Sequence, residues 1–80
     1  MKADRFAKVN EIIAEVLHMD EGDIESQMSL AGDLGADELD VMEILMGVED
    51  EYNVSFDDSD LAEIKTVDDI LKAIIRRQKK

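Results

Sequence analysis

The chain of 80 residues contains no cysteine and no proline, so disulfides and thiolate metal sites are excluded and no proline interrupts a helix. Hydrophobic residues make up 45% of the chain, which is enough for one small core, and we expect a single domain over residues 1–80. The net charge of −12 would repel nucleic acid and attract a basic protein surface.

The charge is distributed unevenly along the chain. Between Asn10 and Ile64 there is no lysine or arginine, although this segment holds eighteen of the 21 acidic residues. Acidity also keeps small proteins soluble, so charge alone leaves a partner and simple solubility both open. No stretch approaches the ~18 apolar residues of a membrane span. Asp4 and Arg5 stand where a signal peptide would have an apolar run, so we expect a cytoplasmic protein. We also expect it to be a monomer.

Residues 4–18 carry apolar side chains at helical spacing, which predicts an amphipathic first helix. His18, the only histidine, falls near the end of this helix, where a capping role is the simplest interpretation. Residues 20–36 contain three of the four glycines and predict a long loop, which is unusual in so small a domain. The apolar stripe of the helix contains Phe6, Val9, Ile12, Ile13, Val16 and Leu17, and the loop is expected to fold back onto the core through Ile24, Met28 and Leu30.

The last third of the chain predicts two more helices. Residues 57–63 indicate a short helix capped by Asp57 or Asp58. Thr66 begins the last helix, and Asp69 three residues later resembles a capping box. Together with residues 37–52, the pattern predicts an all-α protein: a small four-helix bundle of three longer helices and one short helix, with a long loop between the first two. The last helix has an apolar stripe of Val67, Ile70, Leu71 and Ile74, and its C-terminal dipole suits Arg76, Arg77, Lys79 and Lys80.

Residues 37–52, which begin with a good N-cap residue in Asp37, predict a second helix with two apolar faces. Val41, Ile44, Leu45 and Val48 follow the i, i+3, i+4, i+7 pattern and are expected in the core. A second cluster is rotated from the first by roughly 130°. It consists of Leu39, Met42 and Met46 and is flanked by Glu43, Glu49 and Asp50.

This second cluster predicts a recognition surface, because methionine adapts to several partner shapes and the acidic rim suits a basic partner. The alternative is a central helix that is buried on every side. The acidic residues on both sides of the cluster argue against that alternative, so we expect Leu39, Met42 and Met46 to be exposed.

The run LGADELDVMEILMGVEDEYNVSF, residues 34–56, resembles the acyl carrier proteins of the phosphopantetheine-binding family. The resemblance extends without gaps over about residues 4–76. It includes the turn Asp33-Leu34-Gly35 and the segment Ile64-Lys65-Thr66-Val67. The family's motif has a serine between an aspartate and a leucine, and that serine carries a 4′-phosphopantetheine arm whose thiol holds an acyl chain. The resemblance therefore implies a role in fatty acid or related polyketide and lipid biosynthesis.

Carried onto this sequence, Asp37 matches the aspartate, Leu39 the leucine and Glu38 the serine of the motif. The family presents its acidic second helix to basic surfaces of acyl-chain-processing enzymes and to a phosphopantetheinyl transferase. The resemblance implies that this partner face comprises Leu39, Met42, Glu43, Met46, Glu49 and Asp50. It implies that an acyl chain would be surrounded by Val41, Ile44, Leu45, Val48, Phe56, Leu61 and Ile64.

Glu38 departs from the motif, because a carboxylate has no hydroxyl to form the phosphodiester. No serine, threonine or tyrosine lies between Leu30 and Glu51 to replace it. We therefore expect no cofactor on the chain as written, whereas a natural serine at position 38 would imply 4′-phosphopantetheine. A carrier whose serine has been replaced and a natural interaction or regulatory module that has lost the arm both remain open. An unrelated use of the bundle is disfavoured by the length of the resemblance.

Enzymatic activity is a weaker alternative. Glu38 and Asp40 are paired carboxylates, but the chain offers no nucleophile and base to act with them, so we expect a non-enzyme without catalytic residues.

A metal site is also disfavoured. A calcium loop starting at Asp20 would need glycine and glutamate at its sixth and twelfth positions, which are Glu25 and Ala31. We therefore expect no dedicated metal site, although clustered acids such as Asp33, Asp37 and Asp40 leave weak divalent-ion binding open.

Overall fold

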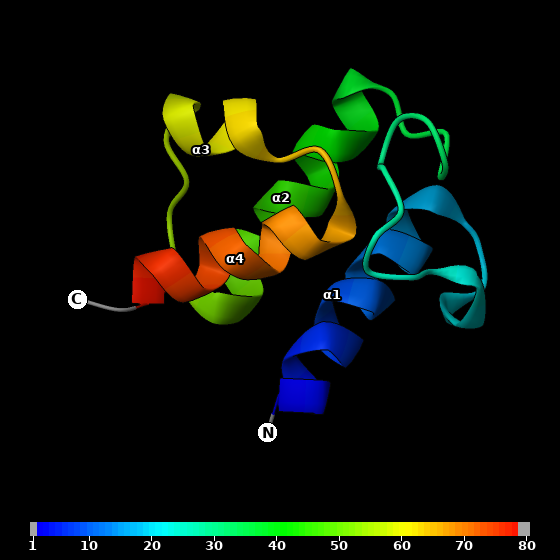
Figure 1. Ribbon diagram of the computed structural model, residues 1–80, viewed down its shortest axis with the longest axis horizontal. Coiled ribbons are helices and arrows are strands. Elements are labelled where there is room, and N and C mark those ends of the chain that lie inside the picture. The colour runs from blue at the N-terminus through cyan, green and yellow to red at the C-terminus, as the bar shows by residue number, and fades with distance from the viewer. Residues whose placement is uncertain (1, 79–80) are drawn as a thin grey trace.

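Helices form almost all of the regular structure in the computed structural model, which describes the backbone of residues 2–78 and the side chains of residues 7–78. Within that range there are four α-helices, one 3-10 helix and no strand. Figure 1 shows how the four α-helices are arranged. The predicted all-α architecture, with one short helix and a long loop after the first helix, is confirmed. The elements are α1 (Lys2–Leu17), η1 (Glu21–Asp23), α2 (Glu38–Tyr52), α3 (Asp58–Glu63) and α4 (Val67–Gln78).

Helix α1 ends where its backbone turns into the left-handed region at His18, with φ of 57°. The N–H of Met19 then donates to the carbonyl of Ala14 at 3.0 Å, which satisfies one of the free carbonyls at the helix end. His18 therefore caps through its backbone conformation. The predicted stripe is confirmed by Val9 and Ile13, which are fully buried, whereas the side chain of Phe6 lies outside the described residues.

The long loop packs against the core and against the start of α4. Ile24 and Leu30 are buried as predicted, and Met28 is half-buried. The N–H of Leu30 donates to the carbonyl of Lys65 at 2.9 Å, and the N–H of Val67 donates to the carbonyl of Met28 at 3.1 Å. These backbone bonds fix a segment that has little regular structure of its own.

Helix α2 crosses α1 at close range through its only glycine. A Cβ atom on Gly47 would lie 3.0 Å from Cγ2 of Ile12, so glycine lets the two helices approach. On the core face, Ile44, Leu45 and Val48 are buried and Val41 is half-buried. The predicted core stripe of this helix is confirmed.

The last two helices begin with the caps that the sequence predicts. The side chain of Asp57 accepts a hydrogen bond from the N–H of Asp60 at the start of α3. At the start of α4, Oγ1 of Thr66 accepts from the N–H of Asp69 at 3.1 Å, and Oδ2 of Asp69 accepts from the N–H of Thr66 at 3.0 Å. The predicted stripe of α4 is confirmed by the buried side chains Val67, Ile70 and Ile74, with Leu71 half-buried.

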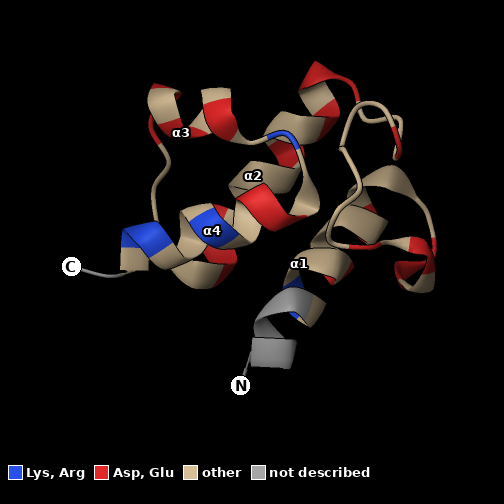
Figure 2. Ribbon diagram, viewed as in Figure 1, with Lys and Arg blue, Asp and Glu red and all other residues tan. Residues whose placement is uncertain are grey.

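Opposite charges gather on different parts of the fold. Figure 2 shows acidic residues over α2, α3, the long loop and the first turn of α4, and basic residues farther along α4 and in the turn before it. Lys79 and Lys80 lie outside the described residues. In residues 2–78, no helix combines the length and apolar character needed to cross a membrane.

Candidate functional site

A tightly bonded turn positions the start of α2. The N–H of Ser29 donates to Oδ2 of Asp33 at 2.8 Å, and the N–H of Asp33 donates to Oγ of Ser29 at 2.9 Å. The N–H of Ala36 then donates to the carbonyl of Leu30 at 2.8 Å. Between these bonds Gly35 adopts φ of 74°, a left-handed conformation that residues with a Cβ rarely adopt. The turn places Asp37 at the N-cap position of α2 in a defined orientation.

Asp37 and Asp40 close a capping box at this helix start. Oδ1 of Asp37 accepts from the N–H of Asp40 at 2.9 Å, and Oδ2 of Asp40 accepts from the N–H of Asp37 at 3.2 Å. The predicted capping role of Asp37 is therefore confirmed. The partner in the box is an aspartate, although glutamate or glutamine is usual at that position.

Glu38 is the first residue of α2, and its side chain is exposed. It lies at the end of the helix where the backbone N–H groups and the macrodipole favour negative charge. The carboxylate is therefore compatible with the fold at this position. It also stands at the mouth of a cavity.

A cavity of about 400 Å³ opens beside Glu38, between the end of the long loop, α2 and α3. We call it the Glu38 cavity. Three residues predicted to surround an acyl chain line it, namely Val41, Leu45 and Leu61. The full lining consists of Ala31, Ala36, Asp37, Glu38, Val41, Met42, Leu45 and Leu61.

The other four residues predicted to surround an acyl chain are not part of this lining. Ile44, Val48 and Ile64 are buried in the core, and Phe56 is half-buried against it. A smaller hollow of about 100 Å³ adjoins the cavity and shares Met42, Leu45 and Leu61 with it. The apolar space therefore continues along α2 toward Met46.

The second apolar face of α2 is exposed, as predicted. Leu39 is 70% exposed, Met42 56% and Met46 61%. Glu43 and Asp50 are exposed beside them, whereas Glu49 is half-buried. We call these six residues the docking face.

The comparisons with known proteins agree with this geometry. The family described as "Phosphopantetheine attachment site" matches residues 7–74, which include the capped start of α2 and the docking face. The chain belongs to the acyl carrier protein family. It is similar to the acyl carrier protein of Thermotoga maritima, with 43% identity over 72 residues, covering 90% of this chain and 89% of the relative.

Acyl carrier proteins are carriers and not enzymes, so the family confirms the expectation that this chain is not an enzyme. Family members interact with acyl-processing enzymes and with phosphopantetheinyl transferases. The matched residues 7–74 include Glu38, the first residue of α2.

One residue of the docking face is bonded within the chain. Oε2 of Glu49 accepts a hydrogen bond from the N–H of Phe56 at 2.7 Å. The resemblance to acyl carrier proteins predicts that Glu49 binds partners, and the structure adds an internal contact with a residue seven positions later. Glu43, whose side chain has no such contact among the described residues, is the better candidate for a free partner-binding carboxylate.

Sequence reasoning missed two residues of the Glu38 cavity, Ala31 and Ala36. Both come from the loop, where helical periodicity gives no signal, and alanine is too common to attract attention. Their small side chains leave room where the loop faces Val41 and Leu45.

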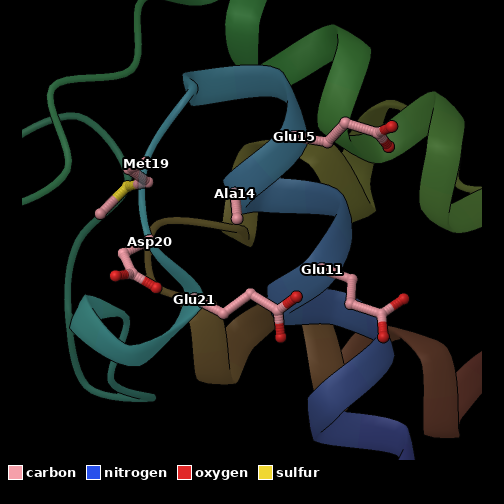
Figure 3. Close-up of a pocket in the computed structure, with 6 residues that line it drawn as sticks. All are labelled: Glu11, Ala14, Glu15, Met19, Asp20 and Glu21. Carbon is pink, nitrogen blue, oxygen red and sulfur yellow. The ribbon is translucent and has the colours of Figure 1, made fainter.

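A separate acidic hollow of about 690 Å³ lies along α1 and the turn after it, as Figure 3 shows. Glu11 and Glu15 line it from α1, and Asp20 and Glu21 line it from the following segment. Across the part of the chain that the structure describes, no three histidine or acidic side chains are arranged to hold a metal ion. This hollow is distinct from the start of α2.

Proposed function

We propose that this chain serves acyl-chain biosynthesis, of fatty acids or of related polyketides and lipids, as an acyl carrier protein-like docking module that does not itself carry 4′-phosphopantetheine. The observation that carries this proposal is Glu38, which occupies the first turn of α2 between Asp37 and Leu39, where the family's motif has its serine.

The docking part of the proposal rests on the docking face. Leu39, Met42 and Met46 offer exposed apolar surface to a partner. Glu43 and Asp50 supply negative charge beside it, and no described lysine or arginine lies between residues 10 and 64 to offset that charge. A basic surface of an acyl-processing enzyme or of a phosphopantetheinyl transferase complements this arrangement. Such encounters take place in the cytoplasm in our proposal.

The non-carrying part rests on chemistry at position 38. A serine hydroxyl would lose its proton and attack the pantetheine-side phosphorus of the pyrophosphate in coenzyme A. The P–O–P bond would break, adenosine 3′,5′-bisphosphate would leave, and a stable phosphodiester would form on the serine. A carboxylate in the same attack would form an acyl phosphate anhydride, which water hydrolyses. Glu38 instead places a carboxylate near the position of that phosphate, at the positive end of the helix.

A second candidate function follows from the same residue. A natural module with glutamate at position 38 would occupy the basic surfaces of acyl-processing enzymes without delivering a substrate. It would act as an interaction or regulatory partner on the same fold. The exposed docking face favours this candidate over an unrelated use of the bundle.

The test uses mass spectrometry after incubation with coenzyme A and a phosphopantetheinyl transferase of broad specificity. We expect no mass change for the chain as it stands and a gain of one phosphopantetheine for Glu38→Ser. Glu38→Ala serves as the matched control and should remain unmodified. A known carrier protein in parallel shows that the transferase is active.

Two outcomes would change the proposal. A mass gain on the unaltered chain would show that another residue takes the arm and would refute the non-carrying part. If several transferases leave Glu38→Ser unmodified, the interaction or regulatory module is favoured, because the docking face then does not support attachment of phosphopantetheine.

A further inference from the structure

Two arginines of α4 hold the short helix α3 through one buried carboxylate. Nη2 of Arg76 donates to Oδ1 of Asp60 at 3.0 Å, and Nε of Arg77 donates to Oδ2 of Asp60 at 2.8 Å. Arg77 also binds Asp57, the N-cap of α3, with 2.9 Å between Nη2 and Oδ2. The side chain of Asp60 is only 4% exposed, although it carries a charge.

A carboxylate this deeply buried stays charged only when it is paired. Burial raises the pKa of Asp60, but hydrogen bonds from the N–H of Asp57 and from both arginines outweigh it, and the pKa falls below its ordinary value. The two guanidinium groups are themselves partly exposed. The arrangement therefore joins the inner side of α3 to the surface side of α4.

The residue after Asp60 faces the Glu38 cavity. Leu61 lines both this cavity and the smaller hollow that adjoins it, opposite Met42 and Leu45 of α2. Asp60 and Leu61 are adjacent on a helix, so their side chains diverge by about 100°. One side chain therefore reaches α4 while the next closes the cavity.

Helix α3 has only six residues, and a helix of this length is not stable by itself. Its position depends on contacts with the rest of the chain. Asp60 is its only buried residue, whereas Leu61 is 42% exposed and adds little anchoring. The ionic contacts of Asp60 therefore attach α3 to α4 from the buried side, and an exposed pair between Arg76 and Glu63, with 3.6 Å between Nη2 and Oε1, adds to them.

We propose that Asp60, Arg76 and Arg77 are positioning residues that hold Leu61 as a wall of the Glu38 cavity, so that this clamp sets how far the cavity opens to an apolar chain. The proposal goes beyond the proposed function. It concerns access to the cavity and holds whether or not position 38 carries an arm.

The test compares Arg77→Met with Lys72→Met in the full chain. Both variants remove one positive charge from α4, but among the described residues Lys72 forms its ion pair with Asp68 of its own helix and acts on the neighbouring Asp69, not on α3. Amide hydrogen exchange followed by NMR is the first measurement. Loss of a charge-assisted hydrogen bond should speed exchange in residues 58–63 by at least about tenfold in Arg77→Met. Exchange in α1 and in Lys72→Met should stay at the level of the parent protein.

Binding of the neutral apolar dye Nile red is the second measurement. Its fluorescence should increase with Arg77→Met, because the loosened α3 admits the dye to the Glu38 cavity, and should not change with Lys72→Met. Arg76→Met removes the more exposed arginine and should give a smaller effect in the same direction. It keeps the test decisive if Arg77→Met does not fold.

Three results would overturn the proposal. Unchanged exchange in residues 58–63 in both arginine variants would show that the clamp does not hold α3. A uniform increase over all helices would show a purely structural role in global stability. Faster exchange in α3 without any increase in dye binding would show that α3 does not control the cavity. None of these results depends on modification at position 38.

Discussion

The carboxylate of Glu49 and the backbone N–H of Phe56 form a 2.7 Å hydrogen bond that ties α2 to the segment leading into α3. Phe56 directly precedes Asp57, the N-cap of α3. A side chain for which the sequence resemblance predicts partner binding therefore also fixes the chain at a helix start. Its loss is expected to affect stability as well as recognition.

Glu49→Ala is therefore expected to lower the free energy of unfolding by about 2 kcal/mol, since hydrogen bonds to charged groups contribute that much when partly buried. Glu43→Ala removes the same charge from an exposed position of α2 and should change stability by less than about 0.5 kcal/mol. Urea denaturation of both variants measures the difference. Equal losses in the two variants would contradict the structural role of Glu49.

Asp37→Ala tests the capping box. Removing the side chain leaves the N–H of Asp40 without its acceptor, and a lost N-cap costs about 1 kcal/mol. Asp37→Asn retains an acceptor oxygen and should recover most of the stability. The measurement is the thermal midpoint of each variant under the same conditions. If Asp37→Asn is as unstable as Asp37→Ala, the charge of Asp37 and not its hydrogen bond stabilises the helix start.

Gly35→Ala tests the turn that precedes α2. Gly35 has φ of 74°, and a left-handed conformation costs a residue with a Cβ roughly 1–2 kcal/mol. Gly22→Ala is the matched control, because a Cβ there would meet nothing closer than 4.0 Å and the backbone is not left-handed. We expect urea denaturation to show a clearly lower free energy of unfolding for Gly35→Ala. For Gly22→Ala the free energy of unfolding should change by no more than about 0.5 kcal/mol. Similar losses at both positions would be contrary to this account.

Local chemistry explains which parts of the fold were predictable from sequence. Three helix starts are capped by Asp37, Asp57 and Thr66. Each side chain accepts a hydrogen bond from the N–H three residues later, so a few consecutive residues of sequence are enough to predict the cap. The stripe of Ile44, Leu45 and Val48 follows from helical period alone. The exposure of Leu39 and Met42 follows from the same period, because one helix cannot bury two opposed faces against a small core.

Long-range contacts explain what sequence reasoning missed. The basic end of α4 was expected to interact with its own helix dipole, yet Arg77 reaches Asp60, seventeen residues earlier in the chain. The cavity beside Glu38 depends on where the loop places Ala31 and Ala36, and no periodic pattern encodes that placement. Such contacts are decided by the packing of segments that lie far apart in the sequence.

Leu39→Ala and Met46→Ala test the docking face. The binding partner is the phosphopantetheinyl transferase that modifies Glu38→Ser, and affinity is measured by calorimetry with that variant as the parent. Truncation of a central apolar residue of an interface weakens the binding free energy by more than about 1 kcal/mol. Ile75→Ala removes an apolar side chain of α4 that is 41% exposed and lies outside the docking face, and it should leave affinity unchanged. A loss at Ile75 equal to that at Leu39 would place the interface elsewhere.

The stability of the protein should fall as the pH falls below about 4. The N–H of Asp60, the hydroxyl of Ser59 and Arg77 together lower the pKa of Asp57 from 3.8 to about 2. The pKa values of Asp60 and Asp69 are lowered as well. Because these folded-state pKa values lie below the unfolded ones, the unfolded chain binds more protons in this range. Their stabilisation is therefore complete above the unfolded pKa and is lost as the pH falls through the folded one.

Urea midpoints measured between pH 6 and pH 2 should therefore decrease most steeply from about pH 4 to pH 2. Asp57→Asn removes one of the responsible groups and should flatten that decrease. Asp58→Asn, an exposed neighbour with no such bonds among the described residues, should keep the slope of the parent protein. If the two asparagine variants follow the same curve, the hydrogen bonds and the ion pair at Asp57 do not link proton binding to folding. A flatter curve for Asp57→Asn alone would instead locate acid sensitivity at the start of α3, the helix that closes the Glu38 cavity.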